Sequence, residues 1–171
     1  MFRPGSKLAF FPVDPIKIHE TGLSAAAITP VGKGDLFPMS NLVLDNPFLE
    51  YLDARHVGWK EGYAEFRMPI QPKHLNRRGV LQGGVVATLL DAACGYAGLY
   101  APEEEPARHG FTLSLTVNYL DTGLGESVTA KGFIERQGRS IFFSRGEAWV
   151  DDKILIASAQ GTFKSAGLKK G

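Results

Sequence analysis

The stretch HLNRRGVLQGGVVATLLDAACGYAG, residues 74–98, predicts both the fold and the candidate site of this chain. Its first part is polar and basic and leads to the pair Gly83-Gly84. Almost every residue after that pair is apolar, apart from one carboxylate, Asp91. A helix that is apolar on all sides must be enclosed by the protein, and a carboxylate within it is costly to bury unless it is paired or functional. We therefore expect a central helix wrapped by a sheet, with the helix N-terminus and Asp91 forming an active site.

The composition predicts a globular protein that needs neither disulfides nor metal to build its core. Of 171 residues, 44% are hydrophobic and 22% are charged, and the net charge is +1. This balance gives no general electrostatic reason to bind nucleic acid or an anionic membrane, and we expect neither partner. Cys94 is the only cysteine, so no intrachain disulfide can form. Its apolar surroundings favour a buried hydrophobic role over a catalytic thiol.

Neither apolar segment of the chain predicts export or membrane insertion. The N-terminal run Leu8–Phe11 is too short for the apolar core of a signal peptide, and prolines follow it. Residues 83–100 are long enough to raise the question of a transmembrane helix, but they contain Asp91 and several glycines. We expect a buried core helix and a cytoplasmic location.

Three segments are expected along the chain. Residues 1–45 form an N-terminal arm, because six of the ten prolines fall at or before Pro47 and glycines punctuate the same region. We prefer a surface wrap over the domain or a neighbouring subunit to a functional lid. Residues 46–165 form the main domain, and the polar residues 166–171 form a tail.

Helix-capping residues and the alternation of apolar and polar residues predict the elements before the central helix. Asn46-Pro47 is a typical helix start, and the helix is expected to run through FLEYLDAR, residues 48–55. Two extended segments follow, and they meet near residues 60–62. In the second, Ala64, Phe66 and Met68 alternate with polar residues, as in a half-buried strand.

Four strand-like runs follow the central helix, at residues 111–119, 127–136, 139–150 and 154–164. Their short connections predict an antiparallel meander that curls around the helix, which gives an α+β fold. In the first run the apolar residues alternate with polar ones, so Thr112 is expected on the face opposite the apolar side chains.

Asn76, Gly83 and Asp91 are the candidate chemical groups of the central stretch. Free N–H groups at the start of a helix suit an oxyanion, and glycine permits close approach by a substrate. Asp91 is suited to act as a general base or a nucleophile. The structural alternatives are a tight turn at the glycines, a turn residue at Asn76 and a core acid paired with an arginine.

The same residues resemble a known family. Asn76, Gly79, Gly83, Gly84 and Asp91 match in order and spacing the motif of the hotdog-fold acyl-CoA thioesterases of the phenylacetate-pathway type, within the 4-hydroxybenzoyl-CoA thioesterase superfamily. The strand FTLSLTVNYLDTG, the turn QGRS and the closing AQGTF are also similar. The resemblance covers residues 46–164.

The resemblance implies a hotdog fold, with a long helix wrapped by five to six antiparallel strands, and a homodimer or a dimer of dimers that hydrolyses an acyl-CoA. It implies that the Gly83 N–H binds the oxyanion and that Asp91 is the base or nucleophile. It further implies that Asn76 positions water or the carbonyl, and that Thr112 assists the acid.

Gln82 departs from the family, which usually has His before the glycine pair. Glutamine can donate and accept hydrogen bonds but does not titrate near neutral pH. Three functions therefore stay open: an acyl-CoA thioesterase, a non-catalytic acyl-CoA-binding protein, and a hydratase or dehydratase acting on enoyl-CoA. We rank the last lowest, because the acid–histidine pair that it needs is not visible.

Coenzyme A brings phosphates, for which arginines are suitable partners. The candidates are Arg77, Arg78, Arg136 and Arg139, with Ser140 in the turn after Gln137. The four histidines show no metal-ligand spacing, and we expect neither a metal nor any cofactor beyond the coenzyme A of the substrate. No elbow motif GxSxG supports a serine triad.

Overall fold

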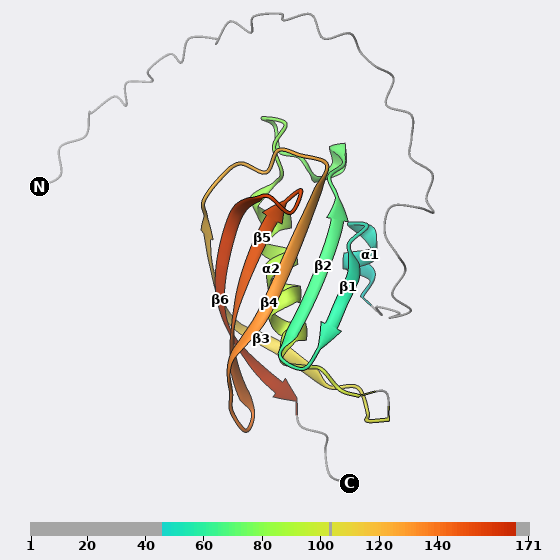
Figure 1. Cartoon of the computed structure of the whole chain (residues 1–171), viewed down its shortest axis with the longest axis vertical. Helices are drawn as coiled ribbons and strands as arrows, with labels where there is room; N and C mark the ends of the chain where they lie inside the picture. The colour runs from blue at the N-terminus through green and yellow to red at the C-terminus, as the bar shows by residue number, and fades with distance from the viewer. Residues whose placement is uncertain (1–45, 103, 167–171) are drawn as a thin grey trace, which may run out of the picture. The chain divides into compact units, whose positions relative to one another are not determined.

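The computed structural model describes residues 46–102 and 104–166. The predicted arm (1–45) and residues 167–171 of the predicted tail lie outside this part. Six strands, two α-helices and a short 3-10 helix make up the fold shown in Figure 1. Their bounds are α1 Pro47–Tyr51, β1 Arg55–Lys60, β2 Tyr63–Pro69, η1 Pro72–His74, α2 Gly83–Ala97, β3 His109–Tyr119, β4 Ser127–Gln137, β5 Ile141–Val150 and β6 Ile154–Ala166. The predicted α+β hotdog architecture is confirmed.

All six strands form one antiparallel sheet, in the order β1-β2-β4-β5-β6-β3. The sheet curves around α2, as Figure 1 shows. The predicted meander is right for β4, β5 and β6 but wrong for β3, which pairs with β6 and not with β4. Residues 120–126 carry the chain across the end of the sheet, held by hydrogen bonds from Leu120 and Asp121 to the carbonyl of Ile156. β3 is consequently an edge strand.

Two glycines let α2 approach the sheet closely. Gly132 of β4 and Gly146 of β5 lie directly opposite each other in the sheet. A Cβ atom at Gly132 would lie 2.0 Å from the carbonyl oxygen of Ala93, and one at Gly146 would lie 2.7 Å from the Cys94 sulfur. At Gly132 only glycine fits, because the atoms in the way belong to the helix backbone, whereas a side chain at Gly146 would require the Cys94 side chain to shift. The buried face of α2 comprises Val86, Leu89, Leu90, Ala93, Cys94 and Ala97.

α2 is thus a core helix of the domain, with its buried face against the sheet. No helix within residues 46–102 and 104–166 has the length and apolar character needed to cross a membrane.

The first helix begins as predicted and ends earlier. The Asn46 side chain accepts a hydrogen bond from the Leu49 N–H, at 3.3 Å, and Pro47 is the first helical residue. The prediction that the helix reaches Arg55 is wrong, since α1 ends at Tyr51. Asp53 adopts a left-handed backbone conformation with φ of 56°, which stops the helix. Its carboxylate is held by the Lys73 ammonium at 2.7 Å.

One buried imidazole makes the fold sensitive to pH. His56 of β1 is only 5% exposed and stacks on Phe66, with ring centroids 4.6 Å apart. Burial lowers its pKa from 6.5 to about 4. The unfolded chain therefore takes up the proton before the folded chain does.

We predict that the free energy of unfolding is highest above pH 6.5 and falls as the pH decreases through the window from 6.5 to about 4. At pH 5 the loss from His56 is about 2 kcal/mol. Urea denaturation at pH 7.5 and pH 5 measures it. His56→Phe removes the group, so its stability should fall less over the same interval. An equal loss in parent and variant would contradict this role for His56.

Candidate active site

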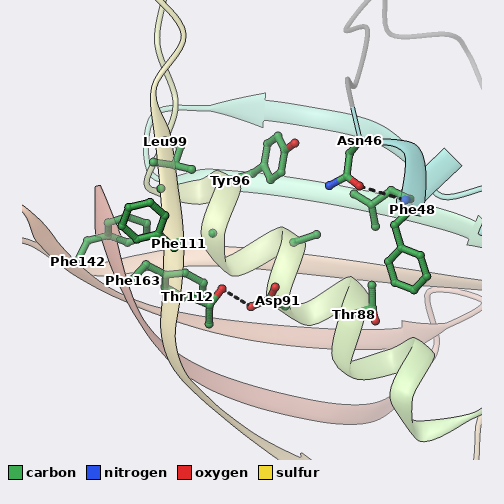
Figure 2. Close-up of a pocket in the computed structure, with 14 residues that line it drawn as sticks. Asn46, Phe48, Thr88, Asp91, Tyr96, Leu99, Phe111, Thr112, Phe142 and Phe163 are labelled. Atoms are coloured by element: carbon green, nitrogen blue, oxygen red, sulfur yellow. Dashed lines mark hydrogen bonds between the residues drawn. The ribbon is translucent and has the colours of Figure 1, made fainter. Parts of the chain in front are cut away.

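Asp91 lies in the middle of α2 and is hydrogen-bonded to β3. The Thr112 hydroxyl donates to the Asp91 carboxylate at 2.7 Å, as Figure 2 shows. Among the described residues no ion pair to an arginine or lysine involves Asp91. The alternative of a core acid paired with an arginine therefore finds no support in this part of the chain.

A one-residue irregularity in β3 turns Thr112 toward Asp91. Thr112 pairs with Phe163, but Ser114 pairs with Thr162, so Leu113 is an extra residue in the ladder. Such a bulge reverses which side of the strand the following residues face. Thr112 therefore shares the helix-facing side with Leu115 and Val117, which pack against the core. The prediction that Thr112 lies opposite the apolar face is wrong for this reason.

The second group of candidate residues lies at the start of α2. Gly83 is the first residue of the helix, as predicted, and Gln82 is its N-cap but makes no side-chain capping bond. The N–H groups of Val85 and Val86 both donate to the Gln82 carbonyl. The N–H groups of Gly83 and Gly84 precede the first intrahelical bonds and remain the donors available to a ligand.

Asn76 sits in the loop that leads into α2. Its side-chain oxygen accepts a hydrogen bond from the Arg78 N–H at 2.8 Å, and Gly79 completes the turn with a φ of 75°. The side-chain amide nitrogen is the group of Asn76 that can serve a ligand. Leu75, Asn76, Arg77, Arg78 and Gln82 line one open hollow.

Asp91 and Thr112 line a different pocket, so within one chain the predicted catalytic residues fall into two groups. Gly83 and Asp91 are separated by ~12 Å along the helix axis at ~1.5 Å per residue. Tyr119 of β3 also stands at the helix start, where its hydroxyl donates to the Gly83 carbonyl at 2.8 Å. No sequence motif predicted this contact.

The pocket at Asp91 extends along α2 between that helix, α1 and β3. Figure 2 shows Thr88 on one side of Asp91, and Leu99, Phe142 and Phe163 on the other. The sequence-based prediction missed these lining residues. Helical spacing from Asp91 is the signal that could have identified those on α2. The remaining lining residues are Asn46, Phe48, Leu49, Ala92, Gly95, Tyr96, Gly110, Phe111 and Thr112.

The candidate phosphate-binding residues are not brought together within one chain. Arg77 and Arg78 are exposed in the loop before α2. Arg136 is exposed near the end of β4, and Arg139 and Ser140 are exposed in the turn between β4 and β5. That turn lies at the opposite end of α2 from the loop, as Figure 1 shows.

Cys94 takes no part in either group. Its side chain is fully buried, and burial raises the pKa of its thiol to about 12. A thiol of this kind stays protonated and is a poor nucleophile at neutral pH.

Three comparisons place this chain among known proteins. The family model "Thioesterase superfamily" matches residues 78–157, which include Gly83, Asp91 and Thr112. The medium/long-chain acyl-CoA thioesterase YigI of Escherichia coli is 28% identical over 130 residues, covering 68% of this chain and 84% of YigI.

Two solved structures have a similar fold. A thioesterase family protein from Silicibacter pomeroyi matches with a TM-score of 0.64 and 29% identity, over 70% of this chain and 89% of that one. The BH2602 protein from Bacillus halodurans, solved with CoA, matches with a TM-score of 0.54 and 29% identity, over 60% and 66% of the two chains. The sequence motif, the wrapped helix and these likenesses agree: the chain has the hotdog fold, and its residues 78–157 match the thioesterase superfamily.

Proposed function

We propose that this protein hydrolyses an acyl-CoA thioester to a carboxylic acid and free CoA. The observation that carries the proposal is the Asp91 carboxylate, oriented by Thr112 at 2.7 Å inside a largely apolar pocket. The match of residues 78–157 to the thioesterase superfamily and the likeness to an acyl-CoA thioesterase support it. The likeness to a structure solved with CoA supports the CoA part of the substrate.

Asp91 has two chemically sound routes to hydrolysis. As a general base it takes a proton from water, the water oxygen bonds to the thioester carbon, and the C–S bond then breaks as the proton passes to the CoA sulfur. As a nucleophile its carboxylate attacks that carbon and expels the CoA thiolate, and water hydrolyses the resulting anhydride. Both routes develop negative charge on the carbonyl oxygen, which the N–H of Gly83 is suited to stabilise.

One chain does not bring these groups together. The reacting carbon must lie within about 3 Å of its attacking group, and its oxygen within about 3 Å of the N–H donor. Gly83 and Asp91 of the same helix are ~12 Å apart along its axis. Two antiparallel helices related by a two-fold axis solve this problem, because Gly83 and Asn76 of one protomer then face Asp91 of the other.

The edge strand supports such a homodimer. β3 ends the sheet, is 11 residues long and exposes Phe111 and Leu113, which are 56% and 54% accessible. A long apolar edge of this kind is suited to pair with a second copy of itself. The same two-fold axis would also bring Arg77 and Arg78 of one protomer toward the β4–β5 turn of the other, where phosphates of CoA could bridge them.

A panel of acyl-CoA thioesters, assayed for released thiol with a thiol-reactive dye, tests the proposed reaction. The leading alternative is a non-catalytic acyl-CoA-binding protein, motivated by Gln82 in place of histidine. That alternative predicts saturable binding of acyl-CoA without thiol release.

We predict that Asp91→Asn lowers thioester hydrolysis by about 10²- to 10⁴-fold and leaves the fold intact, because the change is nearly isosteric. Glu61→Gln is the matched control, since it removes an exposed carboxylate from the turn between β1 and β2. Initial rates and circular dichroism measure the two effects. Hydrolysis by Asp91→Asn at close to the parent rate would show that Asp91 is structural.

We predict that Thr112→Val lowers kcat by about 10- to 100-fold, because it removes a hydrogen bond to a charged group worth roughly 1.5–3 kcal/mol. Thr112→Ser keeps the hydroxyl and should retain most of the rate. Steady-state kinetics on one substrate compare the variants. Equal activity of the Val and Ser variants would exclude a role for the hydroxyl.

We predict that two inactive variants restore one another. In a mixed dimer of Asp91→Asn and Asn76→Ala, one site is intact and the other carries both changes. With random pairing about half the dimers are mixed, so roughly a quarter of parental activity should return after the two are unfolded and refolded together. Two affinity tags verify that mixed dimers form. Mixed dimers without activity would place both residues in one protomer's site or outside any site.

A further inference from the structure

The pocket beyond Asp91 ends in a fixed aromatic floor. Phe142 of β5 and Phe163 of β6 stack with ring centroids 5.2 Å apart and planes 11° from parallel. Both are almost completely buried, at 0% and 2% exposure. A Cβ atom at Gly98 would lie 2.3 Å from the Phe142 ring, and one at Gly161 would lie 2.3 Å from the Phe163 ring. These two glycines provide the space that the rings fill, so the floor has little room to move.

Gly95 lies between Asp91 and this floor. It is one helical turn after Asp91 on α2, and both line the pocket. A Cβ atom at Gly95 would lie 3.4 Å from the Phe163 ring, which is ordinary van der Waals contact. A methyl group therefore fits there, while a longer side chain would occupy the space between the carboxylate and the floor.

The side chains that line the pocket favour an apolar acyl group. Beyond Asp91 the pocket is lined by Ala92, Gly95, Tyr96, Leu99, Phe142 and Phe163, and Asp91 carries the only full charge among the pocket's lining residues. A carboxylated acyl group would lie against apolar rings and near the Asp91 carboxylate, which disfavours it. An unbranched hydrocarbon chain gains burial without any unpaired polar group.

We propose that the acyl chain of the substrate runs from Asp91 toward the C-terminal end of α2, and that Gly95 and the Phe142–Phe163 pair set the longest chain accepted. The inference rests on the proposed function, because it takes the thioester carbon to lie at Asp91. Gly95 is then a specificity-determining residue: it keeps the passage to the floor open. In the parent, kcat/KM rises by about fourfold per added methylene until the chain meets the floor.

A series of saturated acyl-CoA substrates from C2 to C16 tests this inference in three variants. Gly95→Leu should lower kcat/KM for the parent's preferred chain length at least tenfold more than it lowers kcat/KM for acetyl-CoA. Gly95→Ala should act in the same direction but more weakly. Phe163→Leu should move the longest accepted chain upward by one or two methylenes.

Thr88→Leu is the control for the direction in which the acyl chain runs from Asp91. Thr88 lines the same pocket on the opposite side of Asp91, one turn toward the N-terminus of α2. Leucine at this site should not lower the ratio of long-chain to short-chain kcat/KM. A selective long-chain loss in Thr88→Leu, or an equal loss for all chain lengths in both Gly95 variants, would overturn the proposal.

Failure of the proposed function has a different result. If the parent releases no thiol from this series or from the wider acyl-CoA panel, the hydrolytic proposal is wrong, and calorimetry with S-alkyl-CoA thioethers of increasing length then tests the pocket directly. Affinity that rises with alkyl length in the parent and levels off earlier in Gly95→Leu supports the pocket assignment. Affinity that is independent of alkyl length overturns it.

Discussion

The close approach of α2 to the sheet over Gly132 and Gly146 is the constraint on which this structure depends. A side chain at Gly132 would collide with the backbone of α2 itself, not with a flexible side-chain end. The approach lets a helix with a fully apolar buried face lie in the curve of the sheet. It also sets how far Asp91 stands from β3, and therefore whether Thr112 can reach it.

The bulge at Leu113 links this packing to the candidate chemistry. Without it, strict alternation would point Thr112 away from the helix, and the Asp91 carboxylate would lose its hydroxyl partner. The same strand exposes apolar side chains at the free edge of the sheet. β3 thus serves the site in two ways: it orients the acid within one chain, and it offers the edge on which our proposed two-protomer site depends.

Much of the fold could be predicted from sequence, because its signals are local. The apolar stretch after Gly83 predicted the core helix, Asn46-Pro47 predicted a helix start, and alternation predicted β2. The errors come from structural features that no local sequence pattern encodes. The left-handed turn at Asp53 shortened α1, and the return of β3 to the far edge depends on how the sheet closes around α2.

The site was predictable in part for the same reason. The Asn76-to-Asp91 motif lies within one continuous stretch, so its residues could be identified together. The floor of the pocket comes from β5 and β6, more than 40 residues further along the chain, and only the folded sheet brings it beneath α2. Thr112 was identified by resemblance, while its orientation was mispredicted, since a one-residue bulge leaves no mark in an alternating sequence.

In our proposal, one reaction site combines the Asp91 half of one protomer with the Gly83 half of another. A crystal structure with a CoA thioether ketone, in which a methylene separates sulfur from the carbonyl carbon and prevents hydrolysis, tests it most directly. We predict that the carbonyl carbon lies beside Asp91 of one protomer and that the carbonyl oxygen accepts from the Gly83 N–H of its partner. A carbonyl held by groups of one protomer alone, or bound away from Asp91, would exclude a reaction site shared between protomers.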